Sequence, residues 1–127
     1  MTGAAGNVMT PFYKANFALL SGTPHVYGHV SEGSGKKMWL NACENCHCIM
    51  FMTWENFSKG VGVFSGSLDD PNWFERSPAN TVYIFANEAP KGTVFPAHFP
   101  IYKNHAHSFD GTVLEPEILS RHSMIER

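Results

Sequence analysis

Short hydrophobic stretches separated by glycine-containing and polar turns run through the first two thirds of the chain. In residues 25–30, Val26 and Val30 would lie on one face and Tyr27 and His29 on the other, and residues 36–40 alternate in the same way, which predicts two strands. Residues 48–54 are apolar on both faces, as in a strand covered on both sides. Residues 61–67 predict another strand, in which two glycines allow close approach of a neighbouring backbone. Residues 31–35 predict a turn.

Two further strands are predicted, at residues 17–21 and at residues 81–85. The first stops at Gly22, and the second is rich in β-branched and aromatic residues, which is typical of a central strand. After residue 92 the pattern becomes irregular, and Pro96 and Pro100 exclude a central strand between them.

The one helix predicted from the pattern covers residues 115–127. Pro116 suits the first helical position, and the acidic residues on either side of it favour the positive end of a helix dipole. One face of this helix would carry Ile118, Leu119, His122 and Ile125. The chain is therefore predicted to be β-rich, either all-β or α+β, with a C-terminal helix and one domain over residues 1–127.

Composition and charge exclude several classes of function. The chain has 127 residues, 43% of them hydrophobic, which is enough to build a core and excludes wholesale disorder. With 9 basic and 11 acidic side chains the net charge is −2, so there is no electrostatic footprint for nucleic acid. No apolar run approaches the roughly 18 residues of a membrane span, and no secretory leader is visible. We expect no nucleic-acid or membrane partner.

The three cysteines, Cys43, Cys46 and Cys48, lie within six consecutive positions. Such clustering differs from a disulfide framework and favours a reducing compartment, so we expect a cytoplasmic location. Two thiolates at C-x-x-C spacing can bind one tetrahedral zinc, and Cys48 and His47 could complete the ligand set. The alternative is three reduced cysteines in a turn and a core strand. The lack of a second cysteine pair favours that alternative over zinc.

Four short motifs follow one another along the chain. Small residues fill positions 2–6, and Phe-Ala-Leu-Leu-Ser-Gly occupies residues 17–22, followed by Tyr27. Cys-Glu-Asn-Cys occupies residues 43–46, and Gly-Ser-Leu-Asp-Asp-Pro occupies residues 66–71. In order and separation these motifs resemble the glutathione-dependent formaldehyde-activating enzyme family, which includes centromere protein V. The C-x-x-C and the G-x-L-D-D-P are the specific ones.

The resemblance covers roughly residues 1–105 and implies a β-tent fold, zinc binding and carbon–sulfur lyase activity on glutathione adducts. Family members hold a structural zinc with an N-terminal C-x-C and a later C-x-x-C, and a catalytic zinc with a C-x-C-x-x-C. Only the later C-x-x-C has a counterpart, so the resemblance assigns Cys43 and Cys46 as structural zinc ligands. His47 stands where the family has glycine. We expect a chain shortened at its N-terminus, through loss of the first strands or a start at an internal methionine.

Histidine and aspartate side chains supply the candidate acid–base chemistry. His25 and His29 share a face of a predicted strand, whereas the other candidate histidines follow residue 92. Asp69 is added because it neighbours a second carboxylate at the end of a predicted strand. The predicted catalytic set is His25, His29, His98, His105, His107 and Asp69. The alternative is that each is an ordinary surface, loop or turn residue.

The leading prediction is a divergent enzyme of this fold with lyase-like chemistry on a small organic substrate. An aromatic compound is one such substrate. Addition, elimination, dehydration or isomerisation would proceed by histidine acid–base catalysis. A zinc-dependent carbon–sulfur lyase acting on a glutathione or other thiol adduct is one alternative, and a non-catalytic binding or scaffold protein is another. We also expect a homodimer with contacts at residues 8–12, because lost strands would leave a sheet edge uncovered.

Overall fold

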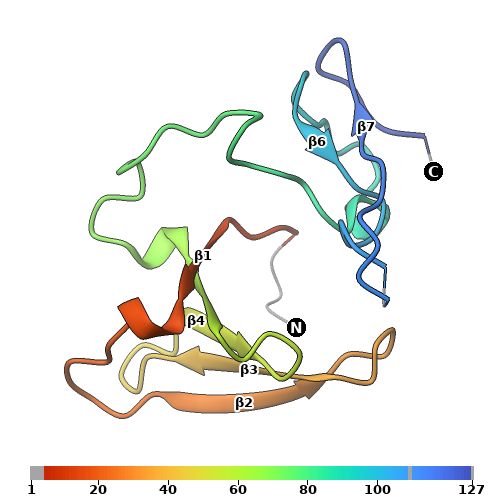
Figure 1. Ribbon diagram of the computed structural model, residues 1–127. Coiled ribbons are helices and arrows are strands. Elements are labelled where there is room, and N and C mark those ends of the chain that lie inside the picture. The colour runs from red at the N-terminus through yellow and green to blue at the C-terminus, as the bar shows by residue number, and fades with distance from the viewer. Residues whose placement is uncertain (1–4, 109, 127) are drawn as a thin grey trace. The chain divides into compact units, whose positions relative to one another are not determined.

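The alternating segments of the first half of the chain form a five-stranded antiparallel sheet in the computed structural model, which describes residues 5–108 and 110–126 (Figure 1). The strands are β1 (Met9–Tyr13), β2 (His25–Val30), β3 (Lys37–Ala42), β4 (Ile49–Trp54) and β5 (Gly60–Phe64). Their order across the sheet is β1-β5-β4-β3-β2, so β1 and β2 form its two edges. The predicted β-rich antiparallel fold is confirmed.

One face of this sheet carries a hydrophobic cluster. Leu40, Met52 and Phe64 are buried there, one from each of β3, β4 and β5. Gly62 lies opposite Met52 in the β4–β5 register, and a Cβ at Gly62 would collide with the Met9 and Trp54 side chains. Glycine at this position therefore lets side chains from β1 and β4 close over the sheet.

The segment between β1 and β2 departs from the prediction. Residues 17–21 form no strand, because Phe17 instead packs its ring on Phe51 of β4, with ring centroids 4.8 Å apart. Leu19 and Leu20 are exposed. A short 3-10 helix, η1 (Lys14–Asn16), precedes this segment, and a second one, η2 (Ser65–Ser67), follows β5.

The chain divides into two units, Met1–Trp73 and Phe74–Arg127, and the prediction of one domain over the whole chain stays a prediction. The second unit contains η3 (Ala86–Glu88) and a two-stranded antiparallel sheet of β6 (Pro100–Ile101) and β7 (Glu117–Ile118). Its buried hydrophobic residues are Ala86, Phe95, Ile101 and Ile125. Within the described ranges, no helix has the length and hydrophobicity needed to cross a bilayer.

The predicted C-terminal helix is wrong for the described part of residues 115–127. Glu117 pairs with Ile101 in the small sheet, and Phe95 and Ser123 exchange two backbone hydrogen bonds of 2.9 and 3.2 Å. These backbone groups bond to a distant segment rather than to the preceding turn. Long-range pairing and burial of Ile125 therefore override a helix signal that was purely local.

The strand predicted over residues 81–85 is also wrong. Tyr83 forms only an isolated bridge with Ile101, and Phe85 has a left-handed φ of 56°, which ends the extended backbone. Phe85 then precedes η3, whose Ala86 is buried. Of this segment, Tyr83 packs against the cluster that contains Ile101, whereas Val82, Ile84 and Phe85 are exposed.

Candidate active site

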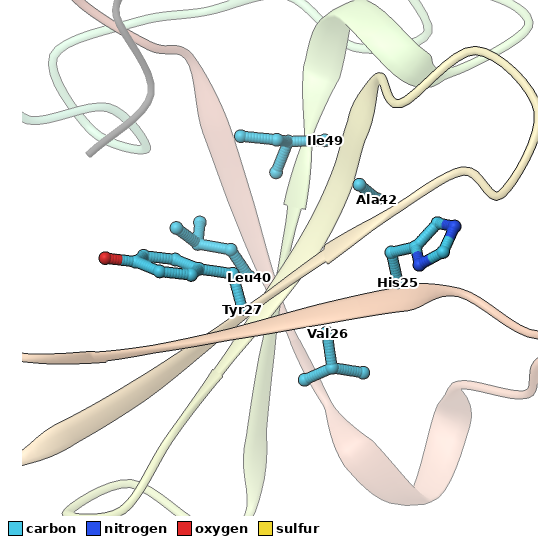
Figure 2. A pocket seen from close by; sticks show the side chains of 6 residues that line it. All are labelled: His25, Val26, Tyr27, Leu40, Ala42 and Ile49. Carbon is cyan, nitrogen blue, oxygen red and sulfur yellow. The ribbon is translucent and has the colours of Figure 1, made fainter.

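A partly open pocket of about 260 Å³ lies over the β2 side of the sheet (Figure 2). Its lining comes from β2, β3 and the first residue of β4: His25, Val26, Tyr27, Leu40, Ala42 and Ile49. In the β2–β3 register His25 lies opposite Ala42 and Tyr27 opposite Leu40, which puts all four on one face. The pocket therefore has an apolar base and carries an imidazole and a phenol at its rim.

A second imidazole lies beside His25. The ring centroids of His25 and His47 are 5.2 Å apart, and both residues are exposed. His47 belongs to the turn between β3 and β4, which begins directly after Ala42. Because Ala42 pairs with His25, the register brings this turn next to the start of β2. His47 is not in the predicted catalytic set, so the structure adds it as a candidate.

The turn that carries His47 is closed by backbone hydrogen bonds. The Cys43 N–H donates to the Cys48 carbonyl and the His47 N–H donates to the Cys43 carbonyl, each at 2.9 Å. His47 has a φ of 58°, in the left-handed region that is unfavourable for a residue with a Cβ. Strained residues of this kind concentrate at functional sites, which makes the His47 side chain worth testing.

The same turn shapes the environment of the Cys43 thiol. The backbone N–H groups of Cys46 and Asn45 donate to the Cys43 sulfur, with a further hydrogen bond from the Cys46 side chain. These donors lower the pKa of Cys43 below the ordinary thiol value of 9.0, against smaller opposing effects of desolvation and of Glu44. Cys43, Cys46 and Cys48 are all free thiols.

The lowered pKa of Cys43 predicts that its thiol is alkylated at lower pH than an ordinary thiol. We expect the pH midpoint for its reaction with iodoacetamide to lie below the midpoint of the same residue in denaturant, because only the thiolate reacts and hydrogen bonds favour that form. Residue-resolved mass spectrometry across a pH series measures this midpoint. In denaturant the hydrogen bonds are lost, so the midpoint should return to the ordinary value; an unchanged midpoint would contradict the assignment.

The cysteine turn meets only part of the requirement for a zinc site. Cys43 and Cys46 provide two thiols joined by the hydrogen bonds described above, and a tetrahedral site needs four ligands. In the part of the chain that the structure describes, no group of three or more His, Cys, Asp or Glu side chains is arranged to hold a metal ion. The residues present therefore form half of a site.

His29 and Asp69 are the remaining candidates of the first unit. His29 is half-buried and stacks on Tyr27, with centroids 6.4 Å apart and an interplanar angle of 28°. Asp69 is exposed in the turn that follows η2. Its neighbour Asp70 accepts the Asn72 N–H at 2.9 Å, an arrangement typical of an aspartate that caps a turn.

The other three candidate histidines lie in the second unit. The His98 N–H donates to the Leu119 carbonyl at 2.8 Å. The rings of His105 and His107 are 5.8 Å apart, and the His107 N–H donates to His105 Nδ1 at 3.2 Å. A neutral His105 therefore carries its ring proton on Nε2. The structure places His25 beside His47 and His105 beside His107. That all six predicted catalytic residues act in one site stays a prediction.

The sequence profile of the family described as "Glutathione-dependent formaldehyde-activating enzyme" matches residues 1–87. The chain belongs to this family. The part of this chain that matches the family profile includes the whole five-stranded sheet, the pocket and the turn at residues 43–48. His98, His105 and His107 lie beyond it. Neither the curated proteins nor the solved structures gave a match.

Membership in the formaldehyde-activating-enzyme family puts two sequence observations in context. The resemblance described above places a family glycine at the position of His47, and the φ of 58° explains that glycine, because glycine adopts positive φ without penalty. The small-residue motif at positions 2–6 can be followed only from Ala5, since its first residues lie outside the described part. His47 therefore departs from the family pattern, and its side chain makes the left-handed backbone at this position unfavourable.

Proposed function

We propose that this family member is a divergent enzyme that carries out lyase-like addition or elimination on a small organic substrate. The observation that carries the proposal is the His25–His47 ring pair, with centroids 5.2 Å apart, in which His25 lines an apolar pocket. Histidines ionise near neutral pH, so two neighbouring imidazoles can share the roles of general base and general acid. The family description supports a thiol and a small aldehyde as the substrate class.

The chemistry follows from the placement of the two rings. For addition of a thiol to formaldehyde, one imidazole removes the thiol proton, the sulfur attacks the carbonyl carbon, and the second, protonated imidazole gives a proton to the carbonyl oxygen. Elimination is the reverse. Leu40, Ala42 and Ile49 form a base that favours apolar parts of a ligand, and the exposed Tyr27 ring offers a stacking surface.

Exchange spectroscopy tests this function without knowledge of the final substrate. Formaldehyde labelled with ¹³C and glutathione form an adduct spontaneously, and the protein should accelerate the exchange between free and adduct signals. Other thiols and small aldehydes or ketones, including aromatic ones, form the rest of the panel. Acceleration of at least one pair supports the proposal. Binding of a panel compound with no acceleration for any pair would favour the non-catalytic binding protein instead.

A zinc-dependent carbon–sulfur lyase is the second candidate, and one observation favours it. Zinc binds cysteine as the thiolate, and the Cys43 sulfur accepts two backbone N–H groups that stabilise that form. Cys43 and Cys46 would be two of the ligands, with Cys48 or His47 as further donors. No catalytic step is assigned to such a zinc, since the described residues complete only half of its coordination.

We expect purified protein to contain well below one zinc per chain, because a two-thiol site lacks half of the ligands that tight binding needs. Elemental analysis of protein purified without chelator gives the stoichiometry, and the double variant Cys43→Ser/Cys46→Ser provides the baseline. A value near one zinc per chain that falls to the baseline in this variant would make the zinc lyase the leading function.

A further inference from the structure

The outer edge of β2 presents backbone N–H and C=O groups that no other described strand pairs with, and the register with β3 shows which residues carry them. The Ser31 N–H donates to the Lys36 carbonyl at 2.9 Å, which continues the β2–β3 register beyond the end of β2. Backbone groups of successive strand residues point to opposite edges, so every second residue from Ser31 back to His25 points to β3. The residues that point outward are Val26, Gly28 and Val30. Among the described residues, no strand or bridge pairs with this edge.

β2 lacks the features with which natural sheets block edge pairing. Its sequence, His-Val-Tyr-Gly-His-Val, contains no lysine, no acidic residue and no proline, and its register with β3 runs without a bulge. Val26, Tyr27 and Val30 are 59%, 59% and 52% exposed. An uncharged, regular edge strand with exposed apolar side chains is a template for pairing with another strand.

The opposite edge of the sheet is blocked. Lys14 N–H donates to the Lys59 carbonyl and Ser65 N–H donates to the Val8 carbonyl, so the even-numbered residues of β1 point to β5. Pro11, in the middle of β1, is then an outward residue without an N–H to donate. The edge at β1, where the sequence suggested a dimer contact over residues 8–12, is therefore less suitable for pairing with a second strand than the edge at β2.

We propose that β2 pairs antiparallel with β2 of a second copy, about a two-fold axis at Gly28, to form one continuous sheet. In this register Gly28 lies opposite the partner's Gly28, and Val26 lies opposite the partner's Val30. Every outward residue then exchanges N–H···O=C bonds, since donors and acceptors along this edge are complementary to themselves under two-fold rotation. A second copy is the occupant because this self-complementarity needs no other sequence.

A register shift of one residue, which moves the axis by half a residue, is excluded because it would place outward residues opposite inward ones. An axis at Tyr27 restores the pairing but brings Val30 opposite the partner's Pro24, which has no N–H. The Gly28-centred register therefore lets every outward residue of β2 both donate and accept, and the absence of a side chain at Gly28 keeps the centre of the contact open.

The pairing also adds a residue to the pocket. Tyr27 would lie opposite the partner's His29 in a non-hydrogen-bonded pair, in which Cα atoms approach to about 4.5 Å. Tyr27 lines the pocket, so the partner's imidazole would stand at its open β2 side. The inference rests on the backbone of β2 and is independent of the proposed function.

Light scattering at micromolar concentration, with reductant present, tests the assembly. We expect twice the chain mass of 14.1 kDa for the unmodified protein. Val26→Lys/Val30→Lys should give the single-chain mass, because two charges are placed on the paired edge. Val113→Lys, at an exposed valine of the second unit, should leave the dimer intact. A monomer for the unmodified protein, or a dimer for the double variant, overturns the proposal.

Cysteine cross-linking tests the register itself. Gly28→Cys should form an intermolecular disulfide on mild oxidation, because paired Cα atoms about 5.5 Å apart meet disulfide geometry. A Cβ at Gly28 has room, with the Trp39 ring 3.7 Å away. Val26→Cys is the matched control, since its two copies would lie about 13 Å apart along the strands. Equal cross-linking of the two variants would overturn the Gly28-centred pairing.

Discussion

Replacing Leu40 by alanine should lower the free energy of unfolding by about 2–5 kcal/mol. Leu40 is 2% exposed and packs with Met52 and Phe64 under the pocket. The truncation removes buried methyl groups and leaves a cavity. The sheet cannot close this cavity freely, because β3 is hydrogen-bonded to a strand on each side. Chemical denaturation followed by circular dichroism measures the loss.

The matched control is Leu20→Ala, which deletes the same atoms at a side chain that is 93% exposed. Surface truncations of this kind change the free energy of unfolding by no more than about 0.5 kcal/mol. Similar losses for the two variants would show that the Leu40 cluster is not the core of the sheet.

Strands β2 and β4 could be predicted because their signal is local and periodic. Alternation at residues 25–30 gave the bounds of β2, and continuous apolar residues gave β4 to within one residue. The periodicity marks extended backbone in both strands, although β2 at the sheet edge is almost wholly exposed and only Met52 of β4 is buried. The C-x-x-C and G-x-L-D-D-P motifs then pointed to the family to which the chain belongs.

The elements that were missed depend on distant partners. Pro11 argues against a strand at residues 9–13, yet β1 forms because proline can face outward on an edge strand. The helix signals around Pro116 are outweighed by pairing of β7 with β6. Neither outcome can be read from a short window of sequence, because each depends on which segment lies alongside.

In the candidate site, too, the residue with a local sequence signal was predicted, and the contact between distant segments was missed. His25 was identified from its position on a predicted strand, and it does line the pocket. Its contact with His47 was missed because it depends on the pairing of His25 with Ala42, which brings a turn of β3 beside β2. One sequence signal was available: histidine at a family glycine position indicates a residue kept in a backbone conformation that disfavours it.

Replacing either imidazole of the His25–His47 pair should lower kcat/KM by about 10²–10⁴-fold, the usual contribution of a positioned general acid or base. His47→Gly removes the imidazole while glycine keeps the positive φ. Relief of the left-handed strain and the greater freedom of glycine in the unfolded chain offset each other to within about 1 kcal/mol. His25→Phe keeps an aromatic ring against residue 47 but removes both ring nitrogens. Both variants should therefore stay folded by circular dichroism.

The assay is the fastest exchange reaction found for the unmodified protein, and His105→Ala serves as the comparison outside the family-matched region. We expect His105→Ala to retain turnover within about fivefold, which corresponds to about 1 kcal/mol and to no more than a positioning contact. The imidazole-pair mechanism fails if His47→Gly and His25→Phe both stay within that limit. If His105→Ala alone abolishes turnover, catalysis belongs to the histidines of the second unit, because His105 lies outside the unit that carries the pocket beside β2.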